Sequence, residues 1–353
     1  MRRILCLALL GAALSSCGAE PGGNVVQPVG GQEKVTVKLV THDSFSASDA
    51  VLEKFTSETG ISIEVLPSGD AGELVNKSAL TAGKPLGDVL FGVDNTFLSR
   101  ALDAELFVPY RSPALTSVPE DLWLDPQHRV TPIDHGEVCV NYDKSAYSQG
   151  RPPPAALSDL TLPAFKDQLV VENPATSSPG LAFLLGTIER FGEDGWEQYW
   201  TALKRNGVEI SSGWEDAYNG SFSGGAGKGP FPLVVSYASS PPAEVHYSET
   251  PKDAPSTAVM EDGCFRQIEF AGVLRGASEP EAAKKVIDFL LSEEFQADLP
   301  LNMFVFPARE HTPLPEVFEK FAARPDSILS MDPERIEKGR EKWVTRWTEL
   351  MAG

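Results

Sequence analysis

The sequence predicts an α/β protein with an open, mostly parallel sheet, helices on both faces of that sheet, and two lobes. Strand-like and helix-like segments alternate from Lys34 to Asn95, which is the rhythm of parallel β-α-β units. A second set of strand and helix signals follows a strand-like segment that begins at Asp134. Removal of a 16-residue leader would leave 353 − 16 = 337 residues, which is enough chain for two separate cores.

The first lobe shows its elements in the pattern of apolar residues. KVTVKLV alternates as a strand, and ASDAVLEKFTSETG is amphipathic and ends at Gly60 as helices do. A strand and loop follow in ISIEVLPSGDAG, then a helix in ELVNKSALTAG and a buried strand in DVLFGVDN. Ligands of such folds bind beyond the carboxyl ends of the strands, so we expect site residues in the loops 41–45, 67–72 and 92–96.

The second lobe begins where DHGEVCVNYDKSAY crosses over as a strand. QLVVEN and FPLVVSYASSPP predict further strands, CFRQIEFAGVLRG predicts the returning strand, and EPEAAKKVIDFLLSEEFQADL predicts one amphipathic helix. The boundaries that follow are 34–136 for the first part of lobe 1, 137–264 for lobe 2, and 265–353 for the return to lobe 1 with the C-terminal helices.

The amino terminus has the anatomy of an export signal. MRRILCLALLGAALSS, residues 1–16, combines two arginines, an apolar core too short to span a membrane, and small residues before Cys17. The tetrapeptide that ends at Cys17 resembles the lipobox of bacterial lipoproteins, in which the cysteine carries the lipid. An ordinary secretory signal with an incidental cysteine is the alternative. Residues 17–33, rich in Gly, Pro and Gln, predict a flexible tether that holds the body off a membrane surface.

The composition of the chain limits its partners and its redox chemistry. A formal net charge of −20 argues against nucleic acid and favours a cationic ligand, although solubility explains it nearly as well. Of the four cysteines, Cys6 leaves with the signal and Cys17 is the expected lipid site. The remaining two, Cys139 and Cys264, most simply form one disulfide in an exported protein.

The segment NPATSSPGLAFLL predicts a helix with a capped start. Ser177 or Ser178 stands before the apolar run, and Pro179 suits the first turn. One interpretation is a capped helix and nothing more. The other is that the free N–H groups and serine hydroxyls bind an anion or a hydroxyl of a ligand.

Motifs of catalysis and metal binding do not occur in the sequence. The five histidines are scattered, and there is no C-x-x-C, H-E-x-x-H or G-x-S-x-G spacing. GGAGKG lacks the glycine spacing of a phosphate loop and has Gly229 where a serine or threonine should follow the lysine.

The loops at the strand ends combine carboxylates with aromatic residues. Asp43, Asp70 and Asp94 each follow a predicted strand, and Trp214 lies four residues before Tyr218, on one helical face. Tyr237 ends another strand. Aromatic faces beside carboxylates attract a flat organic cation. Each aspartate could instead cap the next helix, and the aromatic pair could be core packing.

Six phrases, in this order and separation, resemble the thiamine-binding proteins of bacterial thiamine ABC transporters: THDSF, LFGVDN, NPATSSPGLAFLL, SSGWEDAY, VVSYASSP and LPLNMFVFP. The likeness runs from about Val35 to the C-terminal helices, and GW-x-x-AY and SY-x-x-SP are its most specific pieces. It implies a two-lobed periplasmic-binding-protein-like fold of type II with the ligand cleft between the lobes. It also implies a monomeric carrier without a cofactor or an enzymatic step, which takes thiamine or its phosphates outside the membrane and passes them to an ABC transporter permease.

The same resemblance assigns roles to individual residues. Asp70 and Ala71 fall on the pyrimidine side of the ligand, and Trp214 and Tyr237 fall beside its rings. Ser177 and Ser178 fall in a binding loop, which favours contact with the hydroxyethyl or phosphate tail. The remaining expected ligand contacts are Asp43, Asp94, Tyr218, Ala238, Ser239, Ser240 and Phe304.

The sequence departs from some relatives at three positions. His42 stands in place of a tyrosine and Phe304 in place of a tryptophan, so ring stacking is expected to differ. Ala71 replaces the glycine of an Asp-Gly pair.

Two alternatives remain open at this stage. One is a binding protein for another small cation. The other is a thiaminase-type enzyme of the same fold, in which Cys139 or Cys264 would be a free thiolate beside a base. A disulfide between these two cysteines would remove that nucleophile.

Overall fold

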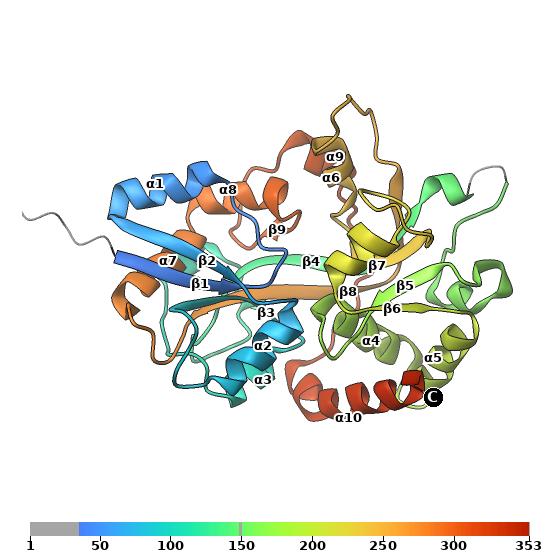
Figure 1. Ribbon diagram of the computed structural model, residues 1–353, viewed down its shortest axis with the longest axis horizontal. Coiled ribbons are helices and arrows are strands. Elements are labelled where there is room, and N and C mark those ends of the chain that lie inside the picture. The colour runs from blue at the N-terminus through green and yellow to red at the C-terminus, as the bar shows by residue number, and fades with distance from the viewer. Residues whose placement is uncertain (1–34, 148–149, 353) are drawn as a thin grey trace, which may run out of the picture. The chain divides into compact units, whose positions relative to one another are not determined.

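The computed structural model describes residues 35–147 and 150–352, and the predicted signal, the tether and Cys17 lie outside these residues. The described chain forms a sheet in the order β2-β1-β3-β8-β4-β7-β5-β6, with β9 paired to β4 (Figure 1). The strands are β1 (Val35–Thr41), β2 (Ile61–Pro67), β3 (Val89–Asp94), β4 (Thr131–Asp143), β5 (Leu169–Glu172), β6 (Glu209–Ser211), β7 (Leu233–Tyr237), β8 (Thr257–Val273) and β9 (Phe306–Pro307).

The sheet is parallel at its two ends and antiparallel in the middle. β1 pairs in parallel with β2 and β3 at one end, as β5 does with β6 and β7 at the other. The ladders β3–β8, β8–β4 and β4–β7 are antiparallel. The expectation of a mostly parallel sheet is therefore wrong for the centre. The reason is that β4 runs from the first end of the sheet towards the other end, and β8 runs back beside it in the opposite direction.

Helices cover the sheet, and their ends follow the capping residues. Ser48 Oγ accepts from Val51 N at the start of α1, and Gly60, with φ 73°, ends it in the left-handed conformation. The helices are α1 (Asp49–Thr59), α2 (Ala71–Leu80), α3 (Leu98–Asp103), α4 (Ser178–Phe191), α5 (Trp196–Arg205), α6 (Pro241–His246), α7 (Pro280–Leu290), α8 (Glu293–Asn302), α9 (Glu316–Phe321) and α10 (Pro333–Ala352).

The single helix predicted over 279–299 is wrong in one respect, because the structure divides it into α7 and α8. The chain leaves helical hydrogen bonding at Leu291 and Ser292, and Ser292 Oγ accepts from Phe295 N to start the new helix. A serine side chain that bonds to a backbone N–H in this way favours the start of a new helix over continuation of the old one. The apolar periodicity continues on both sides of Ser292, so the sequence pattern gave no sign of the break.

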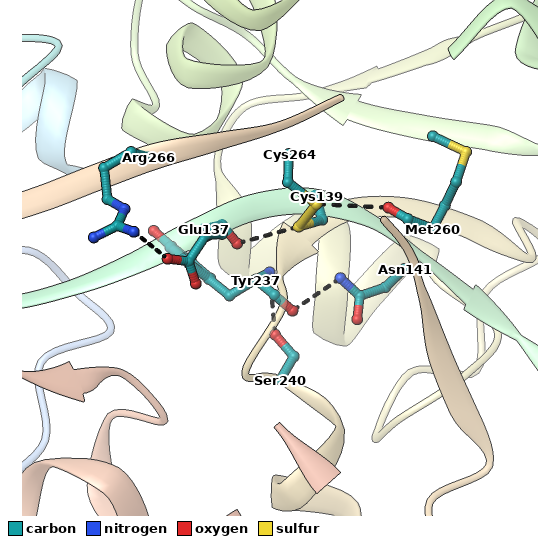
Figure 2. Close-up of a disulfide and its surroundings, with 8 residues drawn as sticks. All are labelled: Glu137, Cys139, Asn141, Tyr237, Ser240, Met260, Cys264 and Arg266. Carbon is teal, nitrogen blue, oxygen red and sulfur yellow. Dashed lines mark hydrogen bonds and ion pairs between the residues drawn. A yellow bond between two sulfur atoms is a disulfide. The ribbon is translucent and has the colours of Figure 1, made fainter. Parts of the chain in front are cut away.

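The two long strands β4 and β8 join both ends of the sheet, and Figure 1 shows them side by side through its middle. The predicted lobe boundaries, 136/137 and 264/265, fall inside these two strands. The register of the β4–β8 ladder shifts between Val138 and Val140. Cys139 lies in this shift, and its Sγ is 2.07 Å from Sγ of Cys264 (Figure 2).

The two cysteines are buried in a small apolar cluster. Both side chains are at most 1% exposed and pack against Ala238. An ion pair of 3.2 Å between Arg266 and Glu137 joins the same two strands (Figure 2). Three features therefore tie β4 to β8 at one point: the backbone ladder, the cysteine pair and the ion pair.

Candidate functional site

A cavity of about 560 Å³ opens at the carboxyl ends of the outer strands. The loops after β1 and β2 line one side, together with β8 and the segment after α8. The start of α4, the segment 214–226, the end of β7 and the helix α6 line the other. The position agrees with the general rule that α/β folds bind ligands beyond the ends of their parallel strands.

Nine of the residues predicted from the sequence line this cavity, and four do not. Those in the lining are Asp43, Asp70, Ala71, Ser178, Trp214, Tyr218, Tyr237, Ser240 and Phe304. Those outside it are Asp94, Ser177, Ala238 and Ser239, each of them completely buried.

Three of the four residues outside the lining occupy defined local positions. Asp94 accepts from Thr96 Oγ1 at 2.7 Å and from Gln267 Nε2 at 2.9 Å, so it organises the turn after β3. Ser177 holds the N-cap position of α4 without capping through its side chain. Ala238 donates its N–H to Glu137 O beside the cysteine pair. In this structure these four side chains are buried beside the cavity and do not line it.

An aromatic wall forms one side of the cavity. The rings of Trp214 and Tyr218 stack with centroids 4.9 Å apart and planes 12° apart, and Tyr237 lies 6.5 Å from Trp214. Trp214 Nε1 donates to Ser236 Oγ at 2.9 Å, which fixes the indole. The spacing of four residues therefore brings two rings together on the turn 214–218. Three aromatic faces with fixed orientation suit a flat cation.

Asp70 lies where the two sides of the cavity meet. Its carboxylate accepts from Ala71 N at 2.6 Å and so caps its own helix, α2. It also accepts from Ser178 N at 3.2 Å and from Trp214 N at 3.0 Å, on the opposite side of the cavity. Burial raises the pKa of this carboxyl group, whereas the hydrogen bonds oppose that rise. Asp70 therefore both caps α2 and lines the cavity, two positions that the sequence left as alternatives.

A group of buried acids at the floor of the cavity was missed in the sequence. Asp134 on β4 and Glu269 on β8 are 2% and 8% exposed and lie opposite each other in the ladder. His42 Nε2 lies 3.1 Å from Glu269 Oε1. Both acids stand in strand-like runs that gave no local sign of a site. Only the pairing of β4 with β8, across more than a hundred residues of sequence, brings them together.

Burial changes the protonation of this group. It raises the pKa of Glu269 to about 8 and that of Asp134 well above its usual range, and it lowers the pKa of His42. This rise favours the neutral form of Glu269 near pH 7, and its carboxyl group lies within hydrogen-bond distance of His42 Nε2. At the floor of the cavity, burial thus favours the neutral forms of Glu269, Asp134 and His42 over their charged forms.

The lining as a whole is acidic. It contains one lysine, Lys252, and one histidine, His42, against six carboxyl groups: Asp43, Asp70, Asp134, Glu215, Glu244 and Glu269. Even with the buried pair neutral, carboxylates outnumber the lysine. The cavity therefore favours a cation.

Contacts between the two sides close the rim of the cavity. Ser44 Oγ donates to Glu215 Oε1 at 3.0 Å, and Glu73 N donates to Thr176 O at 3.1 Å. At another part of the rim, Tyr247 packs edge-on against Phe304, with centroids 5.5 Å apart. These contacts join segments that lie far apart in sequence across the rim of the cavity.

The geometry offers little to a catalytic interpretation. The sulfurs of Cys139 and Cys264 lie 2.07 Å apart, and neither cysteine lines the cavity. Within 35–147 and 150–352, no cluster of three or more His, Cys, Asp or Glu side chains could hold a metal ion. No helix in the same residues combines the length and the apolar character needed to cross a membrane.

Comparison with known proteins agrees with this picture. Residues 84–325 match the family described as bacterial extracellular solute-binding protein. The thiamine-binding periplasmic proteins of Salmonella typhimurium and Escherichia coli are each 29% identical to this chain, over 327 and 324 residues. Both alignments cover 90% of this chain and 94% of the relative.

A solved structure shows the same architecture. A periplasmic thiamin binding protein superposes with a TM-score of 0.79 at 27% identity, and the match covers 92% of this chain and 98% of that one. The fold is accordingly that of the two-lobed type II periplasmic binding proteins, as the sequence predicted, and the relatives are binding proteins rather than enzymes. The chain belongs to the family of bacterial extracellular solute-binding proteins.

Proposed function

We propose that this protein binds thiamine outside the cytoplasm and delivers it to the permease of an ABC transporter. The observation that carries the proposal is the stacked pair Trp214–Tyr218, which lies with Tyr237 in an acidic cavity. Relatives whose names state thiamine binding, aligned over nine-tenths of the chain, support the choice of ligand.

The two rings of thiamine fit the two parts of the lining, the aromatic wall and the carboxyl groups. Its thiazolium ring is a flat cation, and cation–π contact with an aromatic face is worth about 0.5–2 kcal/mol according to desolvation. Its aminopyrimidine ring is neutral and carries both a hydrogen-bond donor and acceptors. The neutral acid Glu269 and the carboxylate of Asp70 can bind such an edge. We assign Asp70, Ala71, Trp214, Tyr218 and Tyr237 as the principal ligand contacts, with Asp43, Ser178, Ser240 and Phe304 at the periphery.

Binding would work through closure of the lobes. A ligand that contacts both sides of the cavity stabilises only the conformation in which both sides are near, and that difference in contact drives the closure. The transporter would then receive a closed, loaded protein. No bond of the ligand is made or broken.

Three further features belong to the same proposal. Cys17 carries a lipid that anchors the protein to the outer face of the membrane, with residues 17–33 as the tether. The body acts as a monomer. Cys139 and Cys264 form a structural disulfide in the exported protein, as their separation of 2.07 Å between sulfurs supports.

Calorimetric titration of the purified protein tests the proposal. We expect saturable binding of thiamine with one site per chain, and no comparable binding of Fe(III) or spermidine. If either of those two cations binds tightly and thiamine does not bind, the proposal is wrong and that cation is the ligand.

A further inference from the structure

We propose that the C-terminal helix α10 is a strap that holds the two sides of the cavity together from outside. It is anchored on the side that contains α4 and α5 (the α4 side), and it grips the side that contains α2 and α3 (the α2 side) through Arg340 and Glu341. Neither of these residues lines the cavity, so they are positioning residues and not ligand contacts. The inference goes beyond the proposed function and rests on it only in the use of thiamine as the probe.

The apolar face of α10 anchors the helix on the α4 side. Trp347 packs edge-on against the completely buried Trp200 of α5, with ring centroids 5.4 Å apart. Trp343 is 3% exposed, and its Nε1 donates to Glu193 Oε2, between α4 and α5, at 3.1 Å. Figure 1 shows α10 lying along α5. Since these contacts bury large side chains, we expect α10 to move together with the α4 side.

The middle of α10 reaches the α2 side at two points. The guanidinium of Arg340 lies over the ring of Phe97, with Cζ 5.5 Å from the ring centroid, which is within range of a cation–π contact. Glu341 Oε1 lies 3.1 Å from Nη1 of Arg100, on α3, and 2.9 Å from Nη2 of Arg340. Arg340 is 8% exposed, so the first contact is shielded from water, whereas the Arg100–Glu341 pair lies at the surface.

Phe97 connects the strap with the rim of the cavity. Its ring is 2% exposed, and a Cβ at Gly72, in the first turn of α2, would lie 2.8 Å from its Cζ. The same Cβ would lie 2.6 Å from the backbone of Thr176, just before α4. A line of contacts therefore runs from Arg340 through Phe97 and α2 to Thr176, and it returns to α10 through α4 and α5. This circuit is complete only when α2 and the segment at Thr176 touch.

Opening of the cavity would break the grip of the strap. When α2 leaves Thr176, Phe97 and Arg100 move with it, whereas α10 stays with α5. Contacts that exist only in the closed arrangement raise its population, and the apparent affinity for a ligand rises in the same proportion. A cation–π contact shielded from water contributes more than an exposed ion pair. Arg340 should therefore matter more than Glu341.

Calorimetric titration of the purified protein with thiamine tests the strap. Arg340→Met keeps the apolar length of the side chain and removes the cation, so we expect about three- to tenfold weaker binding. Arg340→Lys keeps a cation and should recover most of the affinity. Arg346→Met is the matched control, because it removes the same charge from the same helix. The described ion pairs of Arg346, with Glu197 and Glu349, belong to α5 and to α10 itself, so its loss should leave the affinity unchanged.

Two results of this titration would overturn the inference. One is wild-type affinity in an Arg340→Met protein whose circular dichroism matches the wild type. The other is an equal loss of affinity in Arg346→Met. If Arg340→Met fails to fold, the exposed pair decides: Arg100→Gln and Glu341→Gln should each weaken binding by about twofold, and the double variant by no more than the worse single change. Independent losses, or none, would overturn the inference as well.

Failure of the wild type to bind thiamine would instead overturn the proposed function. Small-angle X-ray scattering of the ligand-free proteins then decides on the strap. The radius of gyration of Arg340→Met should exceed that of Arg346→Met, because loss of the grip favours the open arrangement. Equal radii would overturn the inference in that case.

Discussion

The indole of Trp214 is held by ring stacking on one face and by a hydrogen bond at its edge. Tyr218 stacks on it, Tyr237 lies tilted against it, and Nε1 donates to Ser236. A ring held in this way loses little conformational entropy when a ligand binds, so more of its contact energy appears as affinity.

Substitution of this ring should weaken thiamine binding. We expect Trp214→Ala to cost roughly 2 kcal/mol, or about thirtyfold in Kd, measured by calorimetric titration. Trp214→Phe keeps an aromatic face and loses the Nε1 donor, so its cost should be smaller. Wild-type affinity in a folded Trp214→Ala protein would exclude the aromatic wall as the site of the cation.

The second residue-scale prediction concerns Glu269 and pH. The pKa of this group is about 8 in the folded protein and near its ordinary 4.5 in the unfolded chain. Between these pH values the folded state holds a proton that the unfolded chain has released. The free energy of unfolding therefore falls as pH rises from about 4.5 to about 8, by at most about 1.4 kcal/mol per pH unit from this group.

Chemical denaturation at several pH values measures this slope. Glu269→Gln should flatten it, because an amide cannot titrate. Glu64→Gln, which changes an exposed glutamate on β2, should leave the slope as in the wild type. If the slopes of wild type and Glu269→Gln coincide, Glu269 is ionised in the folded protein.

At the scale of the element, the first turn of α2 makes one of the closest approaches across the cavity. A Cβ at Gly72 would lie 2.6 Å from the backbone carbon and oxygen of Thr176, on the other side of the rim. Glu73 N donates to that same carbonyl. A glycine here allows two backbones to touch when the cavity closes.

Gly72→Ala should therefore hold the rim open. We expect at least about a tenfold loss of thiamine affinity. Some loss of thermal stability should accompany it, because the same Cβ would also lie 2.8 Å from Cζ of the buried Phe97. Gly220→Ala is the matched control, because a Cβ at that exposed glycine would meet nothing within 4 Å. Equal affinities of the two variants would mean that α2 and the segment at Thr176 do not need to touch for binding.

The pair β4–β8 is the other element with a specific expectation. A bond between Cys139 and Cys264 closes a loop with a sequence separation of 125 residues. In the chain-entropy model this is worth on the order of 4–5 kcal/mol. The double variant Cys139→Ala/Cys264→Ala should lose about that much in urea denaturation and should be insensitive to reductant, whereas the wild type should weaken when reduced. A wild type that reacts with a thiol reagent before unfolding would contradict the bonded state.

At the scale of the whole molecule, attachment to a membrane depends on residues that precede the folded body. Cys17→Ala should move the protein from the membrane fraction to the soluble exported fraction in its bacterial host, without a change in thiamine affinity. Intact-mass measurement of the wild type should show a lipid on the mature amino terminus. A lipid-free wild type with a cleaved signal would support the ordinary secretory alternative.

Much of the fold could be predicted because the information is local. The spacing of apolar residues predicts the alternation of β1, α1, β2, α2 and β3. Gly60 marks the end of α1, and Asp70 marks the start of α2. The direction of β8 could not be read in this way, because a strand signal carries no information about its neighbours in the sheet.

The residues of the site divide in the same way, into those that local sequence brings together and those that only the sheet brings together. Trp214 and Tyr218 are four residues apart, so their proximity was visible in the sequence. Asp134 and Glu269 meet only through the long ladder, and their burial follows from that meeting. The departure of Ser177 from the lining has a comparable cause, since it stands one residue before Ser178, which lines the cavity, and its own side chain is buried.

The strands β4 and β8 also bear on how the chain reaches its folded state during synthesis. β3 pairs with β1 on one side and with β8 on the other, so its second edge stays unpaired until residue 273 has left the ribosome. β4 waits for β8 in the same way. Domains that are contiguous in sequence can fold one after the other as they emerge, whereas here the first end of the sheet needs a strand made late. The nascent chain must therefore remain without a complete core over most of its translation, and final collapse should follow the appearance of β8 rather than proceed from the amino terminus.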